Sequence, residues 1–218
     1  MYKYKYLFFD LDGTVTDSAE GIYNSVAYAL EKLGHPVEDK ETLRPFIGPP
    51  LTESFREFYG FDDEKVRLGV HYYREYYPQK GIFENRVYDG IVELLKKLHE
   101  SGRKVILATS KPEPFAVRIL EHFGIAQYFD LIAGSTFDTS RQDKADVLKY
   151  AVKSVGVEDL KEALMIGDRK HDVIGAHKVG MDCAYVLFGF GSRDEAEEYG
   201  AEYIIEDVKK LGQFLGSH

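Results

Sequence analysis

The chain has 218 residues, of which 44% are hydrophobic and 30% charged, and its formal net charge is −9. This composition predicts a soluble globular protein. The acidic charge argues against a nucleic acid or an anionic membrane surface as partner, because both require a basic face. A single cysteine, Cys183, excludes a disulfide within the chain. Because we see neither a signal peptide nor a membrane-spanning segment, we expect a cytoplasmic protein without membrane partners.

Short apolar runs alternate with helical patterns along most of the chain. Apolar residues recur at helical spacing within 91–98 and 148–155. The predicted strands are residues 6–9, 105–109, 131–134, 163–167 and 184–188. The alternation predicts an α/β fold, with a Rossmann-like parallel sheet covered by helices on both faces.

Residues 17–83 interrupt this alternation with helical patterns and no convincing strand. The segment PFIGPP at 45–50 is predicted to be a loop, because its prolines cannot donate backbone hydrogen bonds. We therefore expect a small helical cap domain at 17–83, inserted into a discontinuous core of residues 1–16 and 84–218. A helical layer packed elsewhere remains an alternative.

Two carboxylates, Asp10 and Asp12, end the first predicted strand in the segment YLFFDLDGT. Residues two apart on a strand point to the same face, so both side chains can reach one pocket. Ligands of parallel α/β proteins bind at this end of the sheet. Two like charges so close require a cation or a shared proton, and Mg²⁺ prefers such oxygen ligands.

The 163–167 strand also ends in carboxylates. Asp168 follows this strand directly, and Asp172 comes four residues later in the segment GDRKHD. Both are expected at the sheet edge that carries Asp10. Asp172 could instead cap a helix or pair locally.

Hydroxyl and ammonium groups complete the set of candidate site residues. Thr109 and Ser110 end the 105–109 strand and are expected at the start of a helix that Pro112 helps to open. Backbone amides at such a helix start can bind an anion. Lys144 begins the helix before the 163–167 strand and can supply a positive charge, with Lys111 as a competitor. Together these groups predict a metal-assisted phosphate site.

The segments DLDGT, TS, K and GDRKHD, in this order, resemble the four motifs of the haloacid dehalogenase superfamily. The opening DLDGTVTDS and the insert after it most resemble its phosphoglycolate-phosphatase-like branch. The resemblance implies a Mg²⁺-dependent phosphatase acting on a small phosphorylated metabolite, such as phosphoglycolate, a sugar phosphate or a nucleotide. The cap matches only loosely, so the substrate is not fixed.

The resemblance also implies a role for each motif residue. Asp10 would attack phosphorus and form an aspartyl-phosphate, and Asp12 would act as general acid and base. Mg²⁺ would be held by Asp10, the backbone carbonyl of Asp12 and Asp168. Asp172 would act through a metal-bound water or by orienting Lys144. The phosphoryl oxygens would be held by Thr109, Lys144 and the amides near Leu11 and Ser110.

Proteins of other functions carry similar motifs. Dehalogenases and phosphonatases lack an acid at the position of Asp12, which argues against both. A phosphomutase keeps both aspartates, and a receiver-like regulator holds a phosphoryl group without hydrolysing an ester. Whether the protein is a monomer or a homodimer is left open.

Two further features are interpreted as structural. The acidic stretch SRDEAEEYG is predicted to be a solvated helix face, and His171 is predicted to be a lone surface histidine.

Overall fold

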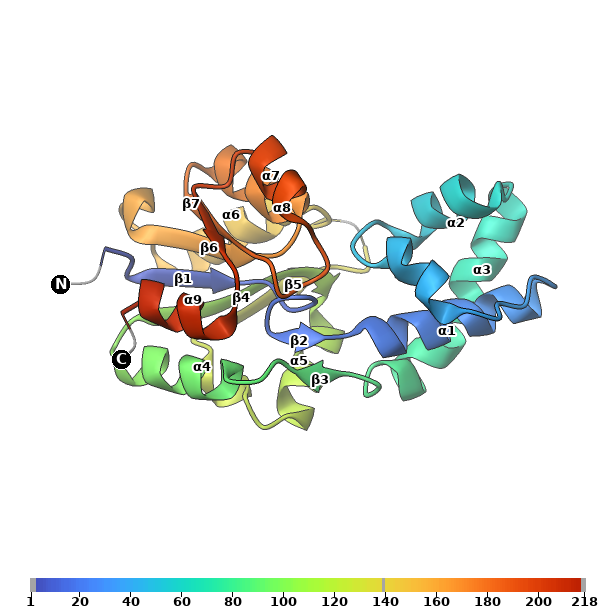
Figure 1. Cartoon of the computed structure of the whole chain (residues 1–218), viewed down its shortest axis with the longest axis horizontal. Helices are drawn as coiled ribbons and strands as arrows, with labels where there is room; N and C mark the ends of the chain where they lie inside the picture. The colour runs from blue at the N-terminus through green and yellow to red at the C-terminus, as the bar shows by residue number, and fades with distance from the viewer. Residues whose placement is uncertain (1–2, 139, 217–218) are drawn as a thin grey trace. The chain divides into compact units, whose positions relative to one another are not determined.

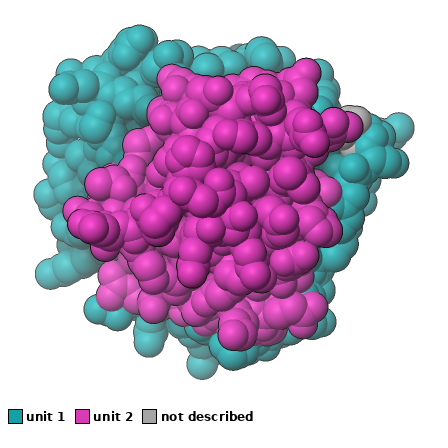
Figure 2. Space-filling model, turned by 90° about the vertical axis from the view of Figure 1, so that its right-hand side faces the viewer, with its two compact units in different colours: residues 1–16, 87–218 teal, residues 17–86 magenta. Residues whose placement is uncertain are grey.

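The computed structural model describes residues 3–138 and 140–216 of the chain. The chain divides into two units (Figures 1 and 2). Unit 1 contains Met1–Thr16 and Val87–His218, and unit 2 contains Asp17–Arg86. Within the described residues, no helix combines the length and apolar character needed to span a bilayer.

Unit 1 is built on a six-stranded parallel sheet, which confirms the predicted fold class. In spatial order the strands are β5 (Leu131–Ser135), β4 (Lys104–Pro112), β1 (Tyr6–Phe9), β6 (Ala163–Gly167), β7 (Asp182–Val186) and β8 (Tyr203–Ile205). β1 lies between two parallel neighbours, and Leu7, Phe8 and Phe9 are fully buried. A strand covered on both faces reads as a continuous apolar run rather than an alternating one.

Helices cover both faces of this sheet. They are α4 (Ile91–Glu100), α5 (Glu113–His122), α6 (Lys144–Val155), α7 (Lys170–Val179), α8 (Arg193–Glu198) and α9 (Val208–Phe214), with 3-10 turns η3 (Ala126–Tyr128) and η4 (Leu160–Glu162). Figure 1 shows α6, α7 and α8 on one side of the sheet and α4, α5 and α9 on the other. One buried cluster joins Phe8 and Met165 of the sheet to Leu148 of α6 and Val173 of α7.

The register of the three central strands brings their carboxyl ends together. Phe9 of β1 pairs with Leu107 of β4 and with Ile166 of β6. The residues after these pairs therefore lie at one edge of the sheet, which is the edge where parallel sheets bind ligands. Asp10 is the first of them.

Unit 2 is helical. Its elements are α1 (Ala19–Lys32), the 3-10 helix η1 (Lys40–Phe46), α2 (Leu51–Tyr59), α3 (Asp63–Tyr76) and the π-helix η2 (Tyr77–Gly81). Where the chain passes between the units, β2 (Thr16–Asp17) pairs with β3 (Arg86–Val87). The predicted cap role of this unit stays a prediction.

Three details differ from the sequence-based expectations. The predicted loop at 45–50 begins inside η1, because Pro45 and Phe46 complete that 3-10 helix. The last predicted strand is displaced toward the amino terminus, to Asp182–Val186. Thr109 and Ser110 do not start a helix: β4 continues to Pro112 with an irregularity after Ala108, and α5 begins at Glu113.

Candidate active site

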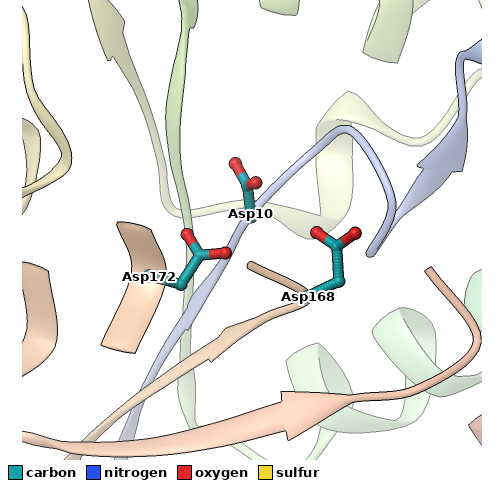
Figure 3. A group of neighbouring side chains, drawn as sticks. All are labelled: Asp10, Asp168 and Asp172. Atoms are coloured by element: carbon teal, nitrogen blue, oxygen red, sulfur yellow. The ribbon is translucent and has the colours of Figure 1, made fainter. Parts of the chain in front are cut away.

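Three carboxylates from two strand ends and one helix gather at the edge of the sheet (Figure 3). Asp10 follows β1, Asp168 follows β6, and Asp172 lies in the first turn of α7. One oxygen from each lies within 4.8 Å of the other two. Oxygens on opposite sides of an octahedral Mg²⁺ ion lie about 4.2 Å apart, so these residues fit such an ion.

Asp168 is the most deeply buried member of this group. Its exposed fraction is 0%. Its Oδ2 accepts a hydrogen bond from the Phe190 backbone N–H at 2.7 Å, whereas its Oδ1 is buried and accepts none within the described part of the chain. Burial, with the charges of Asp172 and Asp10, raises the pKa of Asp168 well above its usual range. A buried oxygen with nothing to accept is suited to a cation ligand.

Lys144 neutralises part of this negative charge. Its Nζ lies 2.8 Å from Asp10 Oδ1, 2.8 Å from Asp172 Oδ1, and 2.8 Å from the carbonyl of Ala108, to which it donates a hydrogen bond. Burial lowers the pKa of Lys144, but Asp10 and Asp172 outweigh that effect and raise it overall. Lys144 therefore stays charged inside the site.

Asp172 both caps α7 and pairs with Lys144. Its Oδ2 accepts a hydrogen bond from the Arg169 backbone N–H at 3.1 Å, which caps α7, and its Oδ1 pairs with Lys144. Burial raises the pKa of Asp172 to about 6, against the opposing charge of Lys144. The capping contact fixes this carboxylate relative to Asp168.

Glycines leave room for the carboxylates. Gly13 has φ 82°, and a Cβ there would lie 2.1 Å from Asp168 Oδ2. A Cβ on Gly167 would lie 2.3 Å from Asp172 Oδ2, and one on Gly189 would lie 2.4 Å from Asp168 Oδ2. These separations are far below van der Waals contact, so side chains larger than hydrogen would displace the acids.

Asp12 lies apart from the group of three and pairs with the other candidate lysine. Its Oδ2 is 2.9 Å from Lys111 Nζ, whose side chain is only 7% exposed. Asp12 Oδ1 is buried and accepts no hydrogen bond from a described residue. The structure thus brings both lysines to the strand ends, Lys144 beside Asp10 and Lys111 beside Asp12.

The two hydroxyl candidates differ in exposure. Thr109 is 1% exposed, and its Oγ1 accepts a hydrogen bond from the Lys111 backbone N–H at 3.2 Å. Ser110 is exposed.

Two residues beside the site escaped the sequence analysis. The predicted solvated face of SRDEAEEYG is wrong for Glu195, which is half-buried and pairs with Arg169. Phe190 supplies only a backbone N–H to Asp168, and a backbone donor leaves no signal in the residue type. His171 is half-buried, and burial lowers its pKa.

Residues 7–186 match the family described as "Haloacid dehalogenase-like hydrolase". The chain belongs to this family. The match includes Asp10, Thr109 and Asp168, so the resemblance of the motifs is confirmed at the family level.

Three curated relatives carry different names. A "5'-nucleotidase" of Pseudomonas aeruginosa is 43% identical over 99% of this chain and 97% of its own. "Tyrosine-protein kinase PtkA" of Mycobacterium tuberculosis is 43% identical over 95% of this chain and 71% of its own. A "Phosphoglycolate phosphatase" of Pseudomonas savastanoi is 32% identical, over 95% and 78%. The expected likeness to phosphoglycolate phosphatases is confirmed.

A solved structure agrees with this membership of the haloacid dehalogenase-like hydrolases. A predicted phosphatase from Clostridium acetobutylicum superposes with a TM-score of 0.90 at 49% identity, covering 96% of this chain and 97% of its own. The predicted enzyme class, a phosphatase-type hydrolase, is thereby confirmed.

Proposed function

We propose that the chain is a Mg²⁺-dependent phosphatase that hydrolyses a small phosphate monoester through an aspartyl-phosphate on Asp10. The observation that carries this proposal is the buried group of Asp10, Asp168 and Asp172 around Lys144 at the ends of parallel strands. Four ionisable groups at 0–13% side-chain or residue exposure are costly to bury, and such clusters are typical of functional sites.

Mg²⁺ would be held by Asp10, Asp168 and the backbone carbonyl of Asp12, with Asp172 next to the ion. Asp168 Oδ1, buried and without a hydrogen bond among the described residues, supports this assignment. A bound Mg²⁺ polarises the phosphoryl group and offsets its repulsion from the attacking carboxylate.

In the proposed mechanism, Asp10 is the nucleophile and Asp12 transfers the protons. A carboxylate oxygen of Asp10 bonds to phosphorus while the ester P–O bond breaks, and the leaving alkoxide takes the proton of Asp12. Water then attacks the aspartyl-phosphate, gives its proton to Asp12, and releases inorganic phosphate with the Asp10 carboxylate restored. Lys111, 2.9 Å from Asp12, orients the carboxylate that moves these protons.

The phosphoryl oxygens would be held by Lys144 and a hydroxyl of the β4 end. We assign the hydroxyl to Thr109 ahead of Ser110. Because Thr109 Oγ1 already accepts from Lys111 N–H, its own proton is free to point toward an anion. The backbone amide at Ser110 would add a second donor.

The substrate would be a small phosphorylated metabolite: phosphoglycolate, a sugar phosphate or a nucleoside 5'-monophosphate. We put nucleotides first in this series because a relative at 43% identity is named 5'-nucleotidase. We propose that unit 2 is the cap that selects among these, since it is inserted a few residues after Asp10 and Asp12. We also propose a cytoplasmic location and a monomer or homodimer.

Phosphate release with Mg²⁺ or with EDTA tests the proposal. The panel contains nucleoside 5'-monophosphates, phosphoglycolate, sugar phosphates and p-nitrophenyl phosphate. We expect Mg²⁺-dependent turnover by the native chain and a loss of at least about 10³-fold in Asp10→Asn, which keeps the shape but removes the nucleophile. Asp194→Asn, the same substitution at an exposed position outside the site, is the matched control for folding.

The same assay separates the alternatives. Isomerised sugar phosphate without phosphate release would indicate a phosphomutase. Stable phosphorylation of Asp10 from a small phosphodonor, with no ester turnover, would indicate a receiver-like regulator. An arm with ATP and a tyrosine peptide is included because one relative is named a tyrosine-protein kinase. Transfer to the peptide would replace the phosphatase proposal.

A further inference from the structure

A carboxylate from a later segment fastens the turn between Asp168 and Asp172. Glu195 Oε1 accepts a hydrogen bond from the Lys170 backbone N–H at 2.8 Å. The same oxygen lies 3.2 Å from Arg169 Nε. Glu195 is thus attached to both residues that follow Asp168, although it lies on α8.

The sheet fixes the position of this carboxylate. Glu195 Oε1 accepts a third hydrogen bond, at 2.8 Å, from the hydroxyl of Tyr185. Tyr185 is a fully buried residue of β7. A Cβ on Gly191 would lie 1.7 Å from the Tyr185 hydroxyl and 2.1 Å from the Asp168 carbonyl oxygen, so the segment before α8 closes tightly over this contact.

The charge of Arg169 gives Glu195 a second effect. Arg169 stands next to Asp168 in the chain, and its guanidinium would repel a divalent cation bound to that carboxylate. Glu195 offsets this positive charge at 3.2 Å. Its side chain is 19% exposed, so solvent screens the pair only in part.

We propose that Glu195 is a positioning residue that holds Asp168 and Asp172 in the geometry required for binding Mg²⁺. It does so through Lys170 N–H, Arg169 and Tyr185, and it does not touch the ion or the substrate. The inference rests on the proposed function, because it takes these carboxylates as the metal site. Mutation of residues that hydrogen-bond to metal ligands and orient them typically weakens metal affinity by about 10–100-fold.

Calorimetric titration of Mg²⁺ into the full chain, without substrate, tests the inference. We expect Glu195→Ala to weaken Mg²⁺ binding by about 10–100-fold. Glu195→Gln should weaken Mg²⁺ binding less, because the amide oxygen still accepts from Lys170 N–H and only the negative charge beside Arg169 is lost. Glu198→Ala, at an exposed position of the same helix, should bind Mg²⁺ as the native chain does. At saturating Mg²⁺ the kcat of Glu195→Gln should return toward the native value.

Native Mg²⁺ affinity in folded Glu195→Ala would overturn the inference. If that variant fails to fold, Glu195→Gln decides by the same criterion. Asp168→Asn distinguishes a failure of the proposed metal site from a failure of the positioning role of Glu195. Loss of Mg²⁺ binding in Asp168→Asn with full binding in the Glu195 variants would contradict the positioning role alone. Absence of binding by the native chain would overturn the metal site and the positioning role together.

Discussion

Lys144 is a buried charge whose position is determined by its acceptors. Its side chain is 3% exposed and lies between Asp10 and Asp172, with the Ala108 carbonyl as a third partner. Removing one member of a buried ion pair leaves the others without compensation, and this typically costs about 3–5 kcal/mol. The lysine therefore stabilises the fold as well as the site.

At the scale of this residue, we predict that Lys144→Met lowers the free energy of unfolding by about 3–5 kcal/mol in EDTA. Methionine fills most of the same volume, so the loss is chiefly electrostatic. Mg²⁺ should reduce the difference in unfolding free energy between Lys144→Met and the native chain. The ion would offset the carboxylate charge that the lysine no longer balances. Urea denaturation with and without Mg²⁺ measures this. Lys153→Met, exposed on the same helix, is the control, and equal stability of the two variants would contradict the prediction.

At the scale of elements, unit 2 depends on a close approach between α1 and η2. A Cβ on Gly21 would lie 1.9 Å from the carbonyl oxygen of Gly81, and one on Gly81 would lie 2.4 Å from Ser25 Oγ. Gly21 N–H donates to the Glu84 carbonyl at 2.9 Å. Two glycines thus let the backbone of the π-helix pack directly against α1.

We predict that Gly21→Ala destabilises the chain by about 1–3 kcal/mol, although alanine is the better helix former. The added methyl group meets backbone, which cannot turn aside as a flexible side chain can. Thermal unfolding by circular dichroism measures the effect. Glu31→Ala, exposed on α1, should change the midpoint little. A Gly21→Ala variant as stable as the native chain would show that η2 can move away from α1.

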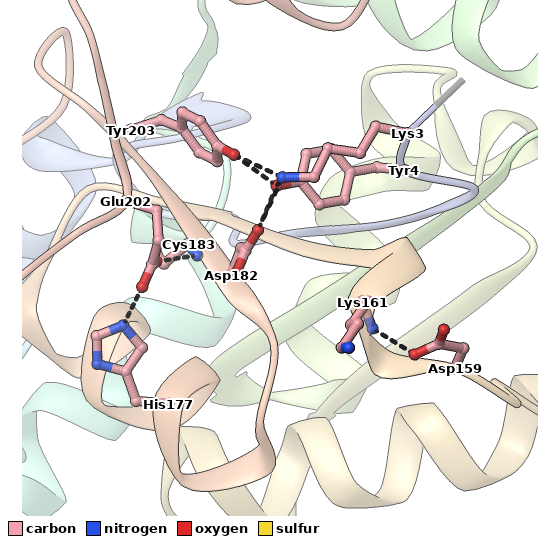
Figure 4. Close-up of polar contacts among 9 residues, drawn as sticks. All are labelled: Lys3, Tyr4, Asp159, Lys161, His177, Asp182, Cys183, Glu202 and Tyr203. Atoms are coloured by element: carbon pink, nitrogen blue, oxygen red, sulfur yellow. Dashed lines mark hydrogen bonds and ion pairs between the residues drawn. The ribbon is translucent and has the colours of Figure 1, made fainter. Parts of the chain in front are cut away.

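At the scale of the whole chain, the amino-terminal segment is tied to strands near the other end of the sequence (Figure 4). Tyr4 donates a hydrogen bond to Asp182 on β7, and its hydroxyl lies 2.9 Å from that of Tyr203 on β8. Lys3 Nζ lies 3.2 Å from Asp182. Nearby, Glu202 accepts from the Cys183 backbone N–H at 2.7 Å and contacts His177 at 3.0 Å.

This network predicts a pH-dependent contribution to stability. Partial burial disfavours the charged form of Asp182, but the hydrogen bonds from Tyr4 and Lys3 outweigh it and lower its pKa. A carboxyl with a lowered pKa in the folded state stabilises the fold above its unfolded pKa of about 3.9, and that stabilisation disappears as the pH falls below it. The side chain is 36% exposed, so we expect at most about 1 kcal/mol.

Asp182→Asn should therefore be less stable than the native chain near neutral pH, and the difference should shrink below about pH 4. Urea denaturation at several pH values measures it. Glu158→Gln, at an exposed position, should show no such trend. A difference that stays constant with pH would mean that shape, and not charge, accounts for the loss.

Hydrophobic patterning along the chain was enough to predict the α/β architecture and the edge of the sheet at which the charged residues meet. Short apolar runs between helical patterns located β1 and β6. In a parallel sheet, the carboxyl ends of adjacent strands lie at the same edge. Asp10 and Asp168 follow those two strands, so their proximity could be predicted without coordinates. The short strand β8 gave too little apolar pattern to be found.

The partner that each side chain takes could not be predicted from the sequence, because it depends on contacts between distant segments. In the sequence, Glu195 is one of several acidic residues in the same stretch, and nothing distinguishes it. In the folded chain it accepts a hydrogen bond from Lys170 N–H, which lies 25 residues earlier. The pairing of Lys111 with Asp12 and the burial of Thr109 beside exposed Ser110 depend on the irregular end of β4. Local spacing governs which face or edge a residue occupies, whereas contacts between distant segments follow from how the whole core packs.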